Sequence, residues 1–444
     1  MKIVIAGAGE VGSHLAKLLT TECQDILVID EDADHLNVLD SNFNLMTIEG
    51  SPTSFRTQRE ARVGYCDLFI AVTPSEADNI VACSIAKNLG AKTTVARISS
   101  YDFMEERNQQ LVTKMGVDRL IYPEYLAANE ILTALRCSWA RNWFELHEGQ
   151  LIVVGVKIRQ GAPIAGMQLK DFARTNHNFH VSAIKRNQET IIPRGNDYLQ
   201  EGDILYIASL RDHVDELLEL TGKTKRVIRR IMIMGGGKIA IRFAALVGDE
   251  YKSKIIDNNE DVCRRLPEKC PDCDVSYGDA RDTDLLREEG IADYDAFLAL
   301  SDSSEANILT CLTAKELGVK KTIAEVENIQ YINQAENLNI GTIINKKLLA
   351  SSTIFQLLLD SDSSTTKCLA LADAEVAEIE AREGSKIVKK PVREIHLPEG
   401  MTLAGLVRDG HGMLVTGDTV VLPGDHVVVF TLSGRLHKAE KIFL

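Results

Sequence analysis

Three glycines near the amino terminus have the spacing of a phosphate-binding turn. They follow an apolar run at 2–6 that is typical of a buried strand, and they stand as Gly7, Gly9 and Gly12 before a predicted helix. In such a turn the first glycine permits the tight bend, the second lets a phosphate approach the backbone, and the third lets the helix pack closely on the sheet. The N–H groups and dipole of the helix then favour an anion. We expect the whole turn to contact a nucleotide, which adds Ala8, Glu10 and Val11.

An acidic residue follows where a ribose would lie. Asp30 ends the next predicted strand, the place at which dinucleotide-binding folds carry a carboxylate for the ribose hydroxyls. The neighbouring Glu31 and Asp32 would repel a 2′-phosphate, which favours NAD(H) or an adenine nucleotide over NADP. A tight turn that holds no ligand is the alternative interpretation of the motif.

The chain contains this unit twice, at a spacing of 228 residues. The segment AKNLGAK at 86–92 recurs as AKELGVK at 314–320. One register kept over many positions indicates a duplication. Further matched residues are Asp67, Phe69, Ala71, Asn79 and Cys83, which correspond to Asp295, Phe297, Ala299, Asn307 and Cys311.

The second copy repeats the glycine turn with changes. After a predicted strand at 231–234, Ala240 stands in place of the third glycine, and Asp257 follows the next strand. Nucleotide binding is again the expectation, with an unliganded turn as the alternative. The expected contacts of this turn are Gly235, Gly236, Gly237, Lys238 and Ile239.

Two other positions predict that the sites differ. Asp279 and Ala280 end the third strand of the second copy, where a carboxylate could contact an adenosine, whereas the first copy has Ser51 and Pro52. These four residues are candidate nucleotide contacts.

Arg97 ends the fifth strand of the first copy, and its counterpart is Glu325. Since ligands of open α/β sheets gather at this edge, the Arg97 guanidinium could reach a phosphate, which a glutamate could not do. A surface ion pair is the alternative role of Arg97.

The overall pattern predicts an α/β protein: two tandem doubly wound Rossmann domains, each followed by a small β-rich α+β domain. In the first copy we expect strands at 2–6, 26–30, 45–48, 68–72, 93–97 and about 118–121, with helices near 11–21, 33–41, 54–63 and 76–89. Alternating strands follow at 151–156, 181–184 and 203–207, and the turn at 201–203 returns at 423–425. The predicted domains are 1–140, 141–222, 227–365 and 370–444, joined by a basic linker at 223–226.

Composition narrows the function. The chain of 444 residues carries 64 acidic residues against 50 Lys and Arg, a net charge of −14, which disfavours nucleic acid and anionic membranes. We expect no direct membrane insertion, because every long apolar run is interrupted by Gly or a charge. Nine cysteines in a large chain indicate reduced thiols and a cytoplasmic protein.

No metal site is predicted. Cys270 and Cys273 form one C-x-x-C pair near Cys263, which supplies only half of a tetrahedral zinc site. A loop dithiol, a metal site and a redox pair all stay open for it. The ten histidines show no ligand spacing.

The duplicated order of glycine turn, aspartate and β-rich domain with its Gly-Asp turn resembles the TrkA-type regulatory subunits of the RCK (KTN) family, over nearly the whole chain. The resemblance implies a cytosolic homo-oligomeric ring of Rossmann modules, peripheral at the inner face of the cell membrane. Its partner would be a TrkH/TrkG-like integral-membrane potassium transporter. The ring would bind NAD(H) or ATP/ADP and change shape without catalysis. The residues to which this resemblance assigns binding are Gly7, Gly9, Gly12, Asp30, Thr73, Asn79, Arg97, Gly235, Gly237, Asp257, Asp279, Ser301 and Asn307.

The segment after the sixth strand is conspicuous. Between Glu124 and Glu145 the two tryptophans, Trp139 and Trp143, are spaced i,i+4, which predicts one helical face. In the family this element crosses to a neighbouring module, and an ordinary core helix is the alternative.

The main alternative function is an NAD-dependent oxidoreductase, because many dehydrogenases share the glycine motif. The small second domains, about 70 residues each, show no evident acid–base pair, which disfavours it.

Overall fold

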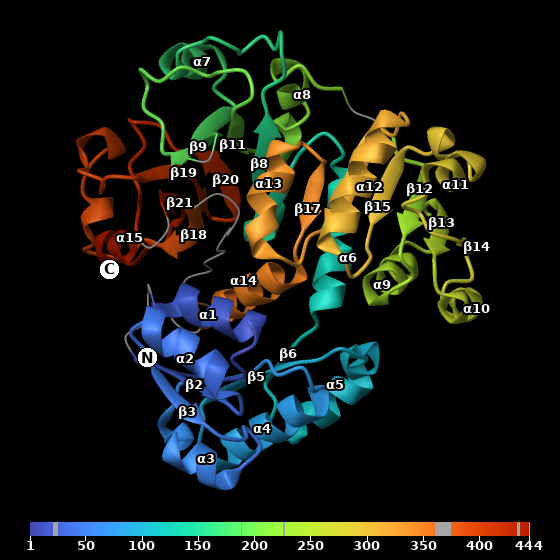
Figure 1. Ribbon diagram of the computed structural model, residues 1–444. Coiled ribbons are helices and arrows are strands. Elements are labelled where there is room, and N and C mark those ends of the chain that lie inside the picture. Colours follow the sequence, from blue (N-terminus) through green and yellow to red (C-terminus); the bar gives the residue numbers. More distant parts are fainter. Residues whose placement is uncertain (21–24, 188, 225–226, 360–373, 433–435, 444) are drawn as a thin grey trace. The chain divides into compact units, whose positions relative to one another are not determined.

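The computed structural model describes residues 1–20, 25–187, 189–224, 227–359, 374–432 and 436–443 (Figure 1). The chain forms two compact units. The first comprises Met1–Leu126 with Lys346–Asp362, and the second comprises Ala127–Asn345 with Ser363–Leu444. Each unit therefore contains residues from both copies of the repeat.

The first unit contains a parallel Rossmann sheet. Its six described strands have the order β3-β2-β1-β4-β5-β6, with helices on both faces (Figure 1). The strands are β1 (Lys2–Ala6), β2 (Asp25–Asp30), β3 (Met46–Glu49), β4 (Leu68–Ala71), β5 (Thr93–Arg97) and β6 (Arg119–Ile121). The helices are α1 (Glu10–Thr20), α2 (Ala33–Asn42), α3 (Phe55–Glu60), α4 (Glu76–Leu89) and α5 (Glu106–Lys114). The predicted strands and helices are confirmed, and α5 is an addition.

The hydrophobic sequence of β1 explains its central place. Residues 3–6 are inaccessible to solvent because β2 and β4 pair with β1 on its two sides and helices cover both faces. The strand order reverses beside β1, and in such sheets the crevice at the carboxyl ends of these strands receives ligands. The glycine turn begins at this crevice.

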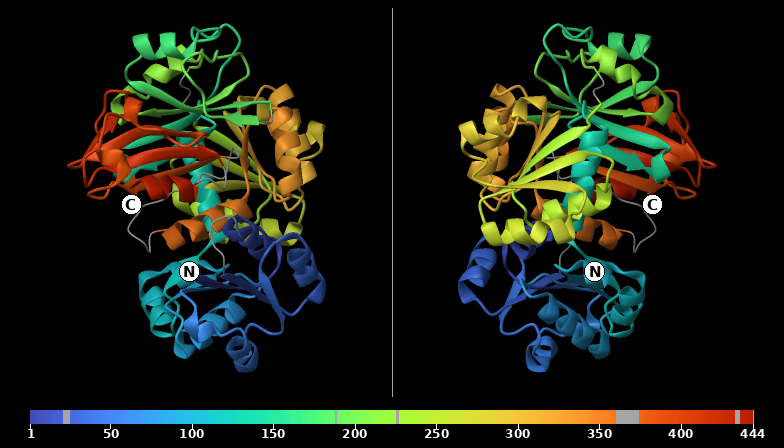
Figure 2. Two further views of the ribbon diagram at one scale, coloured as in Figure 1. Left: turned by 90° about the vertical axis from the view of Figure 1, so that its left-hand side faces the viewer. Right: turned by 90° about the vertical axis from the view of Figure 1, so that its right-hand side faces the viewer.

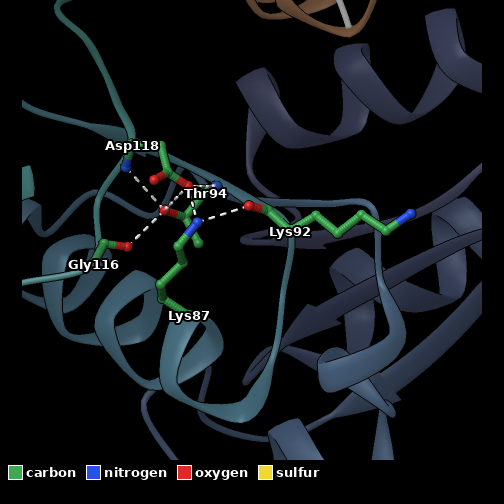
Figure 3. A network of polar contacts seen from close by, with 5 residues as sticks. All are labelled: Lys87, Lys92, Thr94, Gly116 and Asp118. Carbon is green, nitrogen blue, oxygen red and sulfur yellow. Dashed lines mark hydrogen bonds and ion pairs between the residues drawn. The ribbon is translucent and has the colours of Figure 1, made fainter.

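A polar network closes the opposite, amino edge of the same sheet (Figure 3). The Thr94 hydroxyl donates to the Gly116 carbonyl at 2.6 Å, and the Thr94 N–H donates to Asp118 at 2.8 Å. The Lys87 ammonium donates to Asp118 at 2.8 Å and to the Lys92 carbonyl at 2.7 Å. These bonds tie α4, β5 and β6 together away from the glycine turn.

The second unit repeats the Rossmann sheet, in the order β14-β13-β12-β15-β16-β17. Its strands are β12 (Arg230–Met234), β13 (Lys252–Asp257), β14 (Cys273–Tyr277), β15 (Ala296–Ala299), β16 (Lys321–Glu325) and β17 (Thr342–Ile344). Its helices are α9 (Lys238–Val247), α10 (Glu260–Lys269), α11 (Thr283–Glu288), α12 (Ser304–Glu316) and α13 (Ile332–Asn337). The tandem Rossmann prediction is confirmed.

Two small antiparallel sheets complete the second unit, with the orders β10-β9-β11-β8-β7 and β18-β21-β19-β20. The first domain comprises β7 (Asn142–Leu146), β8 (Leu151–Lys157), β9 (Phe179–Arg186), β10 (Glu189–Ile191) and β11 (Ile204–Ser209), with α7 (Leu169–Thr175) and α8 (Glu216–Leu220). The second comprises β18 (Ala374–Glu380), β19 (Met401–Arg408), β20 (His411–Leu414), β21 (His426–Leu432) and α15 (Leu436–Phe443). One apolar cluster joins the sheets, which lie beside one another in green and red in Figure 2.

The repeated Gly-Asp turn has a structural cause in both small domains. Asp203 and Asp425 are 2 % exposed, and each accepts two hydrogen bonds from an arginine on the neighbouring hairpin. Arg186 donates to Asp203 at 2.9 and 2.8 Å, and Arg408 donates to Asp425 at 2.8 and 2.7 Å. In each pair the carboxylate is buried and the arginine is about 30 % exposed, so the two charge-assisted hydrogen bonds compensate a carboxylate that is shielded from water.

The helix predicted to extend through both tryptophans is shorter than expected. Helix α6 (Pro123–Arg136) ends before Trp139, and Trp143 lies in strand β7. The two rings meet edge to face, with centroids 6.4 Å apart. The prediction of one helical face was wrong because aromatic residues also favour strands, and the pairing of β7 with β8 decided the structure.

The helices after the two sixth strands are exchanged between the copies. Helix α14 (Lys346–Leu359), from the second copy, packs on α1 of the first unit. The carboxyl-terminal part of α6, from the first copy, belongs to the second unit, where Arg136 pairs with Glu250 at 2.8 Å. Within this chain the element after each sixth strand thus belongs to the unit of the other copy, and its predicted role in a ring stays a prediction.

Some of the predicted boundaries and linker residues fall outside the part of the chain that the structure describes. The boundaries proposed at 365 and 370, and Lys225 and Arg226 of the basic linker, lie outside the described residues. Among the helices that the structure describes, none is long and apolar enough to cross a membrane.

We predict that Asp425→Ala destabilises the carboxyl-terminal domain by about 1–3 kcal/mol, because Arg408 and the Leu422 N–H lose their charged acceptor. Hydrogen exchange of β19 and β21 in urea should report the loss. Asp418→Ala is the matched control, since the Arg393–Asp418 pair is exposed and contributes about 0–1 kcal/mol. Equal effects of the two substitutions would contradict a structural role of the buried pair.

Candidate nucleotide sites

The first glycine turn has the backbone that a phosphate cradle needs. Gly7 has φ of +107°, and a Cβ there would lie 3.0 Å from the Thr73 nitrogen. A Cβ at Gly12 would lie 1.8 Å from the Gly7 carbonyl oxygen, so α1 approaches β1 as closely as it does only because residue 12 is glycine. A Cβ at Gly9 would meet nothing within 4 Å. The open space at Gly9 lies before the amino end of α1, where a pyrophosphate is expected.

Asp30 connects the phosphate turn to the expected ribose position. Its carboxylate accepts hydrogen bonds from the Ala8 N–H and, at 2.8 Å, from the Asp32 N–H. A carboxylate offers about four acceptor sites, so two backbone donors leave capacity for ribose hydroxyls. Asp32 caps helix α2 by accepting from the Asp34 N–H at 2.9 Å, and Glu31 is exposed.

The carboxyl ends of β4 and β5 are fastened by one buried amide. Asn79 is 1 % exposed, accepts from the Thr73 N–H at 2.9 Å and donates to the Arg97 carbonyl at 2.9 Å. Asn79 therefore positions Thr73 and Arg97. Arg97 itself is half-buried, and its guanidinium has no hydrogen bond or ion pair within the described residues. The surface ion pair considered for Arg97 is not formed within this part of the chain.

Ser51 and Pro52 lie in the turn after β3. The Ser51 hydroxyl lies 3.0 Å from the Thr53 hydroxyl, and the Pro52 carbonyl accepts from Gln58 at 2.7 Å. The carbonyl of Pro52 is thus occupied by the fold, and the hydroxyl of Ser51 is the group of this pair that could contact an adenosine. Val11 is buried under the glycine turn.

The second glycine turn is built in the same way. Gly235 has φ of +96°, the Gly236 N–H donates to Asp257 at 2.7 Å, and Gly237 precedes α9. A Cβ at Gly236 would lie 2.7 Å from Leu266. Ala240 is fully buried, so this copy accommodates a methyl group at the third position. Ile239 and Ala280 are also buried, whereas Lys238 is exposed at the start of α9.

Asn307 repeats the role of Asn79. It is inaccessible, accepts from the Ser301 hydroxyl at 2.6 Å and donates to the Glu325 carbonyl at 2.9 Å. Glu325 is 4 % exposed, unlike the half-buried Arg97 that it replaces. The buried asparagine is therefore the same in both copies, whereas the charged residue at the end of the fifth strand is Arg97 in one copy and Glu325 in the other.

Asp279 differs most from its counterpart in the first copy. The Arg281 guanidinium donates to both of its oxygens, at 2.6 to 3.0 Å, which lowers the pKa of the Asp279 carboxyl below its usual value. The carboxylate of Asp279, which was predicted to contact the adenosine, is therefore already paired with the Arg281 guanidinium. A phosphate of the ligand could use that cation.

Sequence reasoning missed Lys347 in the first site. It is carried by α14 of the second copy, and its ammonium pairs with Glu10, the first residue of α1. A glutamate at this helix end would repel a phosphate, and Lys347 compensates its charge. The other copy carries the opposite charges: Lys238 stands in place of Glu10, and Glu124 stands in place of Lys347 when α6 and α14 are matched from their first residues. No local pattern could predict the contact, because the two residues are far apart in the chain.

A separate part of the second unit gathers cations. Two adjacent cavities, of about 260 and 410 Å³, share Arg159 and Lys223 in their walls. Burial, followed by the charges of Arg141, Arg159, Lys321 and Lys157, lowers the pKa of Lys223 to about 7. The Lys223 ammonium donates to the Trp139 carbonyl. These residues stand apart from the glycine turns in sequence and in fold.

Two parallel sheets with glycine turns, each followed by an antiparallel domain, define a protein of the RCK class. Residues 3–123 and 231–346 match the TrkA-N domain, and residues 153–222 and 376–444 match the TrkA-C domain. The chain therefore belongs to the TrkA family.

Relatives of full length support this assignment. The chain is 30 % identical to the Trk system potassium uptake protein TrkA of Haemophilus influenzae, over 100 % of this chain and 98 % of that protein. It is also 30 % identical to TrkA homolog 1 of Methanosarcina mazei, over 100 % of both.

Solved structures share the fold. The GsuK RCK domain matches with a TM-score of 0.61 and 18 % identity, over 100 % of this chain and 94 % of that one. A GsuK channel bound to NAD matches with a TM-score of 0.62 and 18 % identity, over 100 % and 78 %.

We predict that Gly9→Ala removes nucleotide binding at the first site and changes the free energy of unfolding by only about 0.5 kcal/mol, because the new methyl group enters open space that the phosphate needs. Gly12→Ala, in contrast, should destabilise the domain by about 1–3 kcal/mol through the clash with Gly7. Thermal unfolding and calorimetric titration separate the two effects. Wild-type nucleotide affinity in Gly9→Ala would contradict the placement of the phosphate.

We also predict that the free energy of unfolding increases as the pH rises from about 7 to about 10, because the destabilisation caused by burying Lys223 is lost over this range. The folded pKa of about 7 lies below the usual lysine value, so the unfolded chain binds more protons in this window. The destabilisation is complete below pH 7 and disappears above the unfolded pKa. Lys223→Met should remove this part of the pH dependence in urea unfolding. Lys320→Met, at an exposed position of the same cavity wall, is the control, and identical pH profiles of wild type and Lys223→Met would refute the assignment.

Proposed function

We propose that this chain is a nucleotide-binding regulatory subunit of an integral-membrane potassium-uptake transporter of the TrkH/TrkG type. The glycine turns bind NAD(H), or ATP and ADP, and binding changes the arrangement of the modules. The chain acts without catalysis, as a homo-oligomeric ring in the cytoplasm at the inner face of the cell membrane. The names of the full-length relatives and the RCK fold support the potassium transporter as the partner.

One ion pair supports the proposal that nucleotide binding changes the arrangement of the modules. Glu10 lies in the glycine turn of the first copy, and its ion-pair partner Lys347 belongs to the exchanged helix α14 of the second copy. A phosphate at this turn competes with Glu10 for the same ammonium. Occupancy of the site therefore alters the attachment of α14, and α14 is the direct continuation of the second Rossmann domain in the chain.

Only a modest free energy is required to shift the equilibrium between two arrangements of the modules. A ligand shifts an equilibrium only by its difference in affinity for the two arrangements. A tenfold preference supplies about 1.4 kcal/mol per site, and several sites in a ring add their effects. Two unlike sites per chain would let different nucleotides favour different arrangements.

We predict that Asp30→Ala weakens nucleotide binding at the first site about 10-fold or more, because both the ribose acceptor and the anchor of the Ala8 N–H are lost. Asp257→Ala should act on the second site alone. Calorimetric titration with NAD+, NADH, ATP and ADP measures both, and Asp34→Ala, an exposed acid on α2, is the control. Unchanged titrations in both variants would contradict the assigned sites.

Hydrogen exchange provides the test of coupling. Nucleotide should change the exchange of α14 in the wild-type protein and leave it unchanged in Asp30→Ala. A nucleotide that binds without any effect on α14 would contradict the proposed route. A dehydrogenase would convert the cofactor when offered a substrate, whereas a sensor returns it unchanged.

A further inference from the structure

A buried carboxylate lies between two imidazoles at the contact of the two small domains. Glu378 is 1 % exposed, and its Oε1 lies 2.8 Å from Nδ1 of His147 and 3.1 Å from Nδ1 of His426. The two imidazole centroids are 5.0 Å apart. This cluster has no part in either glycine turn.

The three side chains come from two domains. Glu378 on β18 and His426 on β21 are diagonal neighbours on one face of the last sheet, because Glu380 pairs with His426 and Glu378 pairs with Val428. His147 comes from the turn between β7 and β8 of the other small domain. The cluster therefore bridges two halves of the duplicated protein.

The surroundings make a free carboxylate unfavourable there. The face of the last sheet that carries Glu378 also carries Val376, Val428 and Phe430, which are packed in the apolar cluster between the sheets. The second oxygen, Oε2, is buried and has no hydrogen-bond partner among the residues that the structure describes. Burial of an ionised carboxylate costs several kcal/mol unless charge and hydrogen bonds compensate it.

We propose that His147, Glu378 and His426 bind a divalent transition-metal ion, with Zn²⁺ as the best match. Their three ligand atoms lie within 4.8 Å of one another, and a tetrahedral site with metal–ligand distances of about 2.0–2.1 Å has edges of about 3.3 Å. Two imidazoles select against Mg²⁺ and Ca²⁺, which prefer oxygen ligands. The metal neutralises Glu378 and leaves a fourth position for water.

The neighbouring backbone holds the ligands together. A Cβ at Gly412 would lie 2.6 Å from the Gln150 carbonyl oxygen, and a Cβ at Gly405 would lie 2.9 Å from Leu151. The hairpin of the last sheet thus lies directly against the turn that carries His147. Both imidazoles are about one-third exposed, so an ion can reach the site from solvent.

The site is specific to one side of the repeat. By strand pairing, Gly155 and Ile204 of the first small domain occupy the places of Glu378 and His426. A metal would therefore fasten the β7–β8 turn of the first domain to the last sheet, and the first domain offers no reciprocal carboxylate at that place. This role is independent of nucleotide binding.

The test uses the full chain, stripped of metal with EDTA, in which Cys270→Ser and Cys273→Ser remove the competing thiol pair. We expect one Zn²⁺ per chain by metal analysis after dialysis and a higher thermal midpoint with Zn²⁺. Co²⁺ should give a visible spectrum without a thiolate charge-transfer band. His426→Asn and Glu378→Gln should each weaken the binding of Zn²⁺ more than the about 10- to 100-fold expected from loss of an outer-shell partner.

His411→Asn is the matched control, since His411 is an exposed histidine on β20 of the same domain. It should bind Zn²⁺ as the parent does. Wild-type affinity in both His426→Asn and Glu378→Gln would overturn the proposal. No Zn²⁺ binding to the parent that carries Cys270→Ser and Cys273→Ser would also overturn it.

Discussion

The close approach of helix α1 to the end of strand β1 is the constraint on which the first Rossmann domain depends. It requires a left-handed bend at Gly7 and the absence of a side chain at Gly12, because any Cβ there would collide with the Gly7 carbonyl. The approach aims the first N–H groups of α1 at the crevice where the strand order reverses. Asp30 then fixes the turn from the neighbouring strand through the Ala8 N–H. The N–H groups of the turn and the Asp30 carboxylate are therefore positioned together. In the second copy the Gly236 N–H donates to Asp257 in the same way, although Ala240 stands in place of the third glycine.

The exchange of helices makes the two copies interdependent. Helix α14, which carries the buried residues Ala350, Ile354 and Phe355, packs on α1, so a helix of the second copy covers part of the first Rossmann domain. If α14 were held by apolar packing alone, the charge of a bound nucleotide would not affect its contacts. The Glu10–Lys347 pair adds a charge-dependent contact at the one place where the ligand charge is expected. The proposed coupling would need no distant pathway, because the glycine turn and α14 are joined directly by this residue pair.

Local patterns predicted the parts of the fold that are locally determined. The strands and the first turn followed from hydrophobic runs and glycine spacing, because burial between two helix layers requires such sequences. Helix α5 escaped prediction because only Val112 of its residues is buried, and the tryptophan helix was wrong because period and strand propensity competed over the same residues. Lys347 and the His147–Glu378–His426 cluster could not be predicted, since His147 and Glu378 are separated by 231 residues and meet only through packing of two domains. Histidine spacing along the chain carries no information about such a site.

The duplication separates the demands of folding from those of the ligand. Residues that fasten the scaffold are kept in both copies: Asn79 and Asn307 tie β-strand ends, Asp67 and Asp295 accept the backbone N–H groups that start each sheet, and the Arg–Asp pairs hold both small domains. Residues at the ligand edge differ in charge instead. The first copy has Glu31, Asp32 and Arg97, whereas the second has Asn258, Asn259 and Glu325 at the same places, with Asp279 and Arg281 added. Because an identical scaffold tolerates both sets, the fold does not require either one. This difference in charge is what the proposed function would require if each turn bound its own nucleotide.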